Sequence, residues 1–226
     1  MKLTNLKLWS LTIVLILSCG LANASVLDAS VKIAKSYVYI DEVNVPDFDS
    51  GSTLILHGSL SLDKIIGIQG FSINAEYFKS MSPISYQFKT SNKNDEGLAF
   101  TDILTRNFDH NAAGGYLAYA HPVTKSLRVQ GRVGYVFSEA TDETLITCIG
   151  GCSTRSKPVH KIEGIKAISE HKSISGGGVS VGMNISYTLH KHLFLGAEFT
   201  RAQLKYQGLE GEYGTTYIGI GLGFRI

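Results

Sequence analysis

Two cysteines stand close together in the second half of the sequence, Cys148 and Cys152. Thiols at this spacing can form a short disulfide loop, or they can bind a metal ion together with histidines such as His160 and His171. These four side chains do not reproduce the spacing of a zinc site. In an exported protein an even pair of cysteines favours a disulfide. We therefore expect a disulfide between Cys148 and Cys152 and no metal site.

Histidine and serine occur together at two places, as His57 with Ser59 and as His171 with Ser173. A serine nucleophile needs a histidine base, and that base is usually oriented by a carboxylate. The sequence places no Asp or Glu convincingly beside either pair. It also contains no nucleophile elbow, phosphate-binding loop or zinc signature. We therefore predict no catalytic residues and no cofactor.

The first 24 residues have the three parts of a secretory signal peptide, namely a basic start, an apolar run at 11–17 and small residues ending at Ala24. The run is too short for a membrane helix, which needs about 20 apolar residues. A lipoprotein signal ending at Cys19 fits less well than cleavage after Ala24. We expect residues 1–24 to be a cleaved signal peptide and residues 25–226 to form one domain.

Charge excludes one class of partner. The expected signal peptide contains two lysines and no acidic residue, so its removal lowers the formal net charge from +2 to 0. A neutral chain with interspersed charges lacks the basic surface that nucleic-acid binding requires. We expect no nucleic-acid partner.

Alternation of apolar residues with small or polar ones is the main structural signal after residue 24. Near the C-terminus, Ile218, Ile220 and Leu222 alternate with glycines. A period of two residues is typical of a β-strand. The same pattern predicts eight strands, at residues 30–44, 52–62, 66–78, 109–121, 126–139, 173–188, 192–206 and 213–226. The faces of the first strand stay unassigned, because Lys32 and Lys35 lie on opposite sides of it.

The connections between these strands alternate in length. Short turns are predicted near residues 63–64, 122–126 and 190–191, and longer links at 45–51, 80–108, 140–172 and 207–212. All four prolines fall in these connections, in agreement with their exclusion from paired strands. Short periplasmic turns and longer outer loops are typical of outer-membrane barrels.

A secreted β-sandwich would also show alternation, but the face of its strands that meets water would be richly charged. Here the polar faces are small, rich in glycine and sparsely charged, which suits a narrow lumen. We therefore expect an all-β fold, an eight-stranded antiparallel up-and-down transmembrane β-barrel.

The expected lumen carries four charged residues, Glu76, Arg128, Arg132 and Glu198. Charges inside a narrow barrel are costly unless they are paired. Arg132 and Glu198 lie at similar heights above their periplasmic turns, so we predict an ion pair between them. The cluster is consistent with a gate or narrow ion path. We favour the alternative, a lumen that is filled by its own side chains.

Short motifs rich in glycine and aromatic residues add a resemblance. They are Tyr37 to Asp41, Asp47 to Gly51, Gly114 to Tyr116 and Gly219 to Phe224. They resemble the opacity-type porin-like proteins over residues 30–226, a family similar to the transmembrane domain of outer-membrane protein A. The resemblance implies a location in the outer membrane of a Gram-negative bacterium. It also implies contact with outer-membrane lipids, lipopolysaccharide and the barrel assembly machinery. One departure is the end of the chain at Ile226, because such barrels usually end on an aromatic residue.

Together these patterns favour a non-enzymatic barrel with a structural or surface-interaction role, similar to that of an adhesin. We expect the extracellular loops at 80–108 and 140–172 to carry that role. Residues 140–171 hold four basic and four acidic residues, so they form no phosphate-binding patch and suit a host or envelope ligand. The alternatives are a narrow porin-like channel and a lipid A-modifying enzyme, because some barrels of this size modify lipids.

Overall fold

The structure is a computed structural model that describes residues 27–40, 50–93, 99–150, 160–162, 165–207 and 213–226. The signal peptide expected at 1–24 and the cysteine at position 152 lie outside the described residues. No helix in the described part of the chain is long and apolar enough to cross a membrane.

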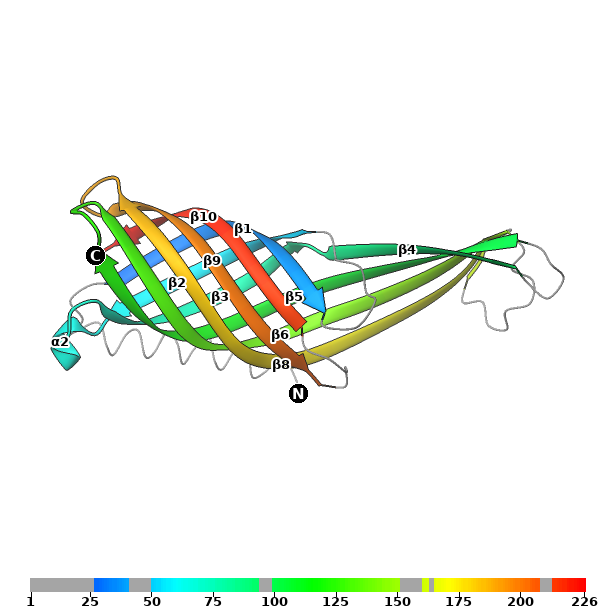
Figure 1. Ribbon diagram of the computed structural model, residues 1–226, viewed down its shortest axis with the longest axis horizontal. Coiled ribbons are helices and arrows are strands. Elements are labelled where there is room, and N and C mark those ends of the chain that lie inside the picture. The colour runs from blue at the N-terminus through cyan, green and yellow to red at the C-terminus, as the bar shows by residue number, and fades with distance from the viewer. Residues whose placement is uncertain (1–26, 41–49, 94–98, 151–159, 163–164, 208–212) are drawn as a thin grey trace.

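Eight antiparallel strands close into a barrel (Figure 1). They are β1 (Leu27–Ile40), β2 (Gly51–Ser61), β3 (Phe71–Ser82), β5 (Ala99–Pro122), β6 (Leu127–Gly150), β8 (Ile165–Thr188), β9 (Leu193–Tyr206) and β10 (Tyr213–Arg225). Each barrel strand pairs with the next one along the chain, and β1 closes the ring by pairing with β10. The predicted fold is confirmed, and each of the eight predicted strands has its counterpart.

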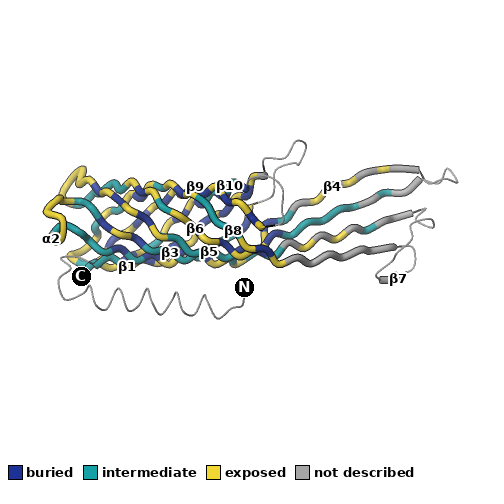
Figure 2. Tube along the Cα trace, turned by 90° about the horizontal axis from the view of Figure 1, so that it is seen from below, coloured by how far each residue is buried: buried dark blue, intermediate teal, exposed yellow. Residues whose placement is uncertain are grey.

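Burial alternates along the barrel strands, as β9 shows over its whole length (Figure 2). Buried residues face the lumen, and the alternate positions expose apolar side chains on the outer surface, such as Ile220 and Val133. This contrast is the one a lipid-facing surface around a packed lumen requires. It also assigns β1, because Lys32 is 1% exposed and faces the lumen while Lys35 is exposed.

The expected loops at 80–108 and 140–172 are wrong as loops, because most of their residues form strands. The strands β5, β6 and β8 have 24 residues each, whereas β9 has 14. Their outer halves form a sheet with two further strands, β4 (Ile84–Lys93) and β7 (His160–Ile162). We term this sheet the extension (Figure 2).

The strands of the extension were not predicted from the sequence, and there is a physical reason for this. Beyond the barrel rim neither face of a strand meets lipid, so the sequence no longer contrasts apolar with small residues. Its residues are instead mixed on both faces, as in Thr144 to Thr147. Cross-strand pairing holds such strands together without a membrane.

The opposite end of the barrel carries the short connections. The first of them contains a single-turn helix, α2 (Asp63–Ile66), and the Asp63 carboxylate accepts a hydrogen bond from the Gly70 backbone N–H at 2.8 Å. Because Gly70 has a φ of 91°, β3 begins at Phe71, later than the predicted residue 66. We term this end periplasmic and the extension end extracellular, following the usual placement of short turns.

This topology predicts which positions can be labelled on intact cells. In a background with Cys148→Ser and Cys152→Ser, Ser91→Cys in the extension should react with a membrane-impermeant maleimide. Lys125→Cys, in the exposed turn between β5 and β6, should react only after the outer membrane is permeabilised. Labelling in the reverse pattern would show that the orientation is inverted.

Candidate functional site

Four charged side chains meet in the middle of the lumen, and each is 0% exposed. We term them the lumen charge network. Arg132 donates one hydrogen bond to Glu76 and another, at 2.5 Å, to Glu198. Lys32 donates to the second carboxylate oxygen of Glu198. Two cations thus face two anions, and the formal charges of the buried group cancel.

Further contacts fix the guanidinium of Arg132. Its Nη2 also donates to the hydroxyl of Thr200, which in turn donates to Glu198 at 2.9 Å. The Tyr116 ring lies 4.7 Å from the guanidinium carbon, within range of a cation–π contact. Arg132 is therefore held by side chains from three other strands, β3, β5 and β9. Its own side chain crosses a fourth strand, β8, at Gly182.

Glycines make the room that the two long cations need. A Cβ atom at Gly182 would lie 2.6 Å from Arg132 Nε, and one at Gly221 would lie 2.1 Å from the Val31 backbone oxygen and 2.7 Å from Lys32 Cγ. Because β10 carries glycine where Lys32 passes, this lysine on β1 reaches Glu198 on β9 across the strand between them. Glycine at position 182 thus leaves room for Arg132, and glycine at position 221 allows β1 with Lys32 to lie close to β10.

His57 extends the network toward the periplasmic end. It is the direct cross-strand partner of Glu76, and its Nδ1 lies 2.8 Å from Glu76 Oε1. The sequence alone did not place this carboxylate beside His57. Within the described residues no hydrogen bond joins His57 to Ser59, and both side chains face the lumen. The arrangement therefore lacks the nucleophile–base contact that a serine hydrolase requires.

An aromatic layer lies on the extracellular side of the network, and we term it the aromatic plug. Its rings are Phe78, Phe108, Tyr206, Tyr213 and Tyr217. Ring centroids are 4.6 Å apart for Phe78 and Tyr217 and 5.2 Å apart for Tyr206 and Tyr213, distances typical of packed aromatic pairs. Two polar tips are also satisfied, because His110 lies 2.7 Å from the Tyr217 hydroxyl and Ser138 lies 2.9 Å from that of Tyr206. The plug fills the lumen beneath the extension.

The periplasmic mouth holds a separate group of charges. Asp28 accepts two hydrogen bonds from Arg225, at 2.8 and 2.9 Å, across the seam between β1 and β10. Arg128, which we predicted as part of the lumen cluster, lies here, 3.7 Å from Asp28 and with 36% of its side chain exposed. Two cavities at this level have volumes of about 20 and 30 Å³. Each has room for about one or two water molecules.

The remaining predicted site residues lie in the extension. Cys148 is on β6, and its predicted partner at position 152 lies outside the described residues. The backbone of His171 pairs with that of Glu143. Among the described residues no three His, Cys, Asp or Glu side chains are grouped as a metal site would require.

The lumen charge network predicts non-additive stability effects. Arg132→Ala should lower the free energy of unfolding by about 3–5 kcal/mol, because it leaves buried carboxylates in excess. Arg132→Ala with Glu198→Ala leaves Lys32 and Glu76, which are again balanced, so the double change should cost on the order of 2 kcal/mol less than the sum of the single ones. Urea unfolding of the barrel in lipid vesicles measures this.

The matched control is Arg128→Ala, which removes a guanidinium from the partly exposed mouth. Its effect should stay within about 1 kcal/mol. Strictly additive effects at Arg132 and Glu198 would mean that the two side chains do not interact.

Comparison with known proteins places the chain among bacterial outer-membrane barrels. A family model described as the outer membrane protein beta-barrel domain matches residues 12–225. No curated protein matches the sequence. Neisserial surface protein A is similar in structure, with a TM-score of 0.51, 10% identity, and coverage of 88% of this chain and 96% of that one.

Two further solved structures are similar over comparable lengths. OprG from Pseudomonas aeruginosa gives a TM-score of 0.46 at 10% identity, covering 89% of this chain and 94% of that one. Ail of Yersinia pestis, solved with the heparin analogue sucrose octasulfate, gives 0.43 at 12% identity, covering 89% and 98%. Because the family model spans nearly the whole chain, this protein belongs to the outer membrane protein β-barrel domain family, whose place is the outer membrane of Gram-negative bacteria.

Proposed function

We propose that this barrel is a non-enzymatic surface-interaction protein and that the extension carries its binding role. The observation behind the proposal is the unequal length of the barrel strands. Three of them, β5, β6 and β8, continue far beyond the ends of β1, β2, β9 and β10 (Figure 1). A membrane anchor alone has no use for this additional sheet, which lies outside the lipid and outside the lumen.

The filled lumen argues against the porin-like alternative. An eight-stranded barrel is just wide enough to be filled by side chains. Here the aromatic plug lies above the lumen charge network, and the cavities at the periplasmic mouth have volumes of only about 20 and 30 Å³. We infer that these two layers block the passage of a hydrated ion.

The extension offers the mixed chemistry of a protein-binding or glycan-binding surface. One face pairs polar side chains across strands, as in the 2.9 Å hydrogen bond between Ser85 and Asn107. The alternate positions include apolar side chains, such as Leu104 on β5. Within the described residues β4 pairs with β5 alone, so β4 is an edge strand of the extension. Exposed edges readily pair with another chain.

The other partners follow from this role. The barrel wall would contact outer-membrane lipids and lipopolysaccharide, and the assembly machinery would insert the exported chain after removal of residues 1–24. A host or envelope ligand would meet the extension. We also propose that Cys148 and Cys152 form a disulfide that shapes the tip of the extension, because both would be exposed to the oxidising periplasm during export.

A trimmed variant tests the proposal while preserving the barrel. Ser85 pairs with Asn107, and Glu143 pairs with His171, so each pair can be closed by an Asn-Gly turn after deletion of the residues between them. Cells with the complete protein should bind at least one component of an array of matrix proteins, glycans and envelope molecules. Cells with the trimmed barrel should bind that component at least about tenfold less.

The folded state of each variant is checked by its heat-dependent mobility in gels. Undiminished binding by the trimmed barrel would refute a role for the extension. The double variant Cys148→Ser, Cys152→Ser should insert normally but bind less. Free labelling of both thiols in the denatured, unreduced wild-type protein would show that the disulfide is absent.

A further inference from the structure

The outer wall of the barrel carries several cations near the end of the apolar band, and two of them, Lys35 and Arg201, share one patch. Lys35 on β1 and Arg201 on β9 are exposed on the face that alternates with the lumen. Neither side chain has an ion-pair partner within the part of the chain that the structure describes. A cation on the lipid face is costly at the bilayer midplane and tolerated only near an interface. Whether Lys35 and Arg201 are tolerated on the wall therefore depends on their depth in the membrane.

Both residues lie on the extracellular side of the wall. Arg201 is five residues before the end of β9 at Tyr206, and Lys35 is five residues before the end of β1 at Ile40. On the outer face of β9, the positions before Arg201 are apolar, from Leu193 to Phe199. The two cations thus mark the place where the apolar band ends and the outer interface begins.

The register brings the two cations onto one patch. Arg201 is the partner of Thr216 on β10, and Thr216 is the partner of Tyr37 on β1. Lys35 is two positions from Tyr37 on the same face of the same strand. Because adjacent strands are about 4.8 Å apart and two residues along a strand span about 7 Å, Arg201 and Lys35 are about 12 Å apart at the backbone. Long side chains span that distance, so one head group can contact both cations.

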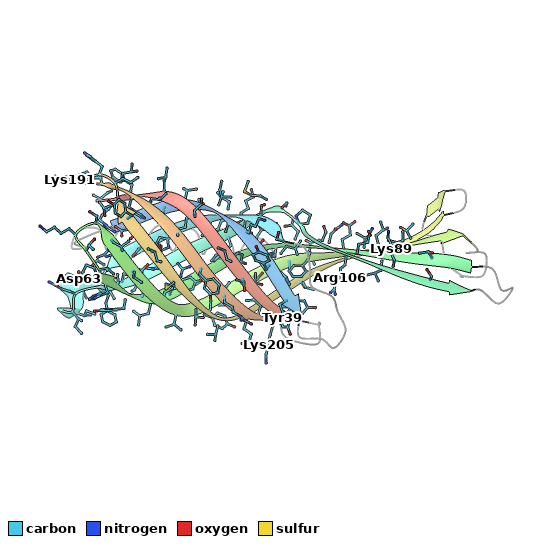
Figure 3. The ribbon with its side chains drawn as sticks, turned by 45° about the horizontal axis from the view of Figure 1, so that its top comes forward. Tyr39, Asp63, Lys89, Arg106, Lys191 and Lys205 are labelled. Carbon is cyan, nitrogen blue, oxygen red and sulfur yellow. The ribbon has the colours of Figure 1, made fainter. Side chains whose placement is uncertain are left out.

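The charge of the surroundings favours an anion. Among the described residues that face outward on β8, β9, β10, β1 and β2, none is acidic. The acids of the outer belt, Asp109 and Glu139, are on β5 and β6, across the ring from β10 and β1. Figure 3 shows Tyr39 and Lys205 at the same extracellular end of the barrel, while Asp63 and Lys191 lie at the other end.

We propose that Arg201 and Lys35 form a binding site for a phosphorylated glycolipid of the outer leaflet, the lipid A part of lipopolysaccharide. The guanidinium and the ammonium bind phosphate oxygens, which are the anions available at that depth. Thr216, on the strand between the two cations, and Tyr37, two residues beyond Lys35, carry hydroxyls that suit the sugar. The acyl chains lie along the apolar wall below, over Phe199 and Ile218. This site is independent of the extension and of its ligand.

Vesicles of phosphatidylcholine with a small share of lipid A, carrying the complete protein, provide the test. Native mass spectrometry of the released barrel counts the lipid A molecules that it retains. Arg201→Gln with Lys35→Gln should retain at least about tenfold less lipid A than the wild-type protein. The wild-type protein should retain dephosphorylated lipid A equally poorly, and an excess of inorganic phosphate should not displace the intact lipid.

The matched control removes two cations from the periplasmic turns, Lys125→Gln with Lys191→Gln, and should retain lipid A like the wild-type protein. A second measurement separates binding from folding. The Arg201→Gln, Lys35→Gln variant should unfold at a lower temperature than wild type in vesicles with lipid A, and at an equal or higher temperature in phosphatidylcholine alone. If that variant does not fold, the wild-type comparison of intact and dephosphorylated lipid A still decides the matter.

Three results would overturn the proposal. Equal retention of lipid A by the wild-type protein and the Arg201→Gln, Lys35→Gln variant would mean that the two cations are solvated and do not bind the lipid. Equal loss in the periplasmic control would mean that retention follows overall charge. Retention of dephosphorylated lipid A by the wild-type protein would mean that phosphate is not what the site binds.

Discussion

The guanidinium of Arg132 is the interaction on which the rest of the lumen depends. It binds Glu76 on β3 and Glu198 on β9 at once, and Glu198 also binds Lys32 on β1. A buried charge is stable only when it is paired and hydrogen-bonded, so none of these side chains can be placed without the others. Strands from both ends of the chain are thereby tied across the barrel, including β1, whose pairing with β10 closes it. The glycines facing Arg132 and Lys32 are a consequence, because larger residues would occupy the space of the two cations.

The same constraint divides the molecule into regions with different tasks. Inside, the charges of the network cancel and the aromatic plug packs above them, so the lumen supports the wall. On the wall, the uncompensated cations Lys35 and Arg201 occur at the outer interface, where a lipid phosphate can reach them. Above the rim, the extension neither encloses the lumen nor forms the lipid-facing wall, so under the proposed function its sequence can vary with a ligand. In the proposed function, membrane anchoring and ligand recognition therefore belong to separate parts of the protein.

The sequence predicted well those features that a strong contrast of environments imposes. The eight barrel strands alternate between lipid and lumen, and that contrast is visible in residues such as Ile218, Ile220 and Leu222. The prediction of an ion pair drew on the same alternation, and Arg132 and Glu198 are in contact. The strands of the extension were missed because they have no such contrast.

Other contacts between side chains depend on the register of the strands and on the length of the side chains. The alternation of residue types gives no information on either. The sequence could not show which face of β1 meets the lumen, because Lys32 and Lys35 lie on opposite faces of the strand. Glu76 meets His57 only because β2 and β3 pair in one particular register. Arg128 shares a face with Arg132 but lies four residues nearer the mouth, where Asp28 and water compensate its charge. The glycines opposite Lys32 were a usable signal, since they mark where a long side chain can cross a strand.

Electrical recording from the purified protein in a planar lipid bilayer tests directly whether the lumen is filled by its own side chains. We predict no steady current at any applied voltage that the bilayer withstands, because the lumen charge network and the aromatic plug occupy the lumen in two successive layers. A stable, ohmic conductance from the wild-type protein would contradict the account and would restore the porin-like function.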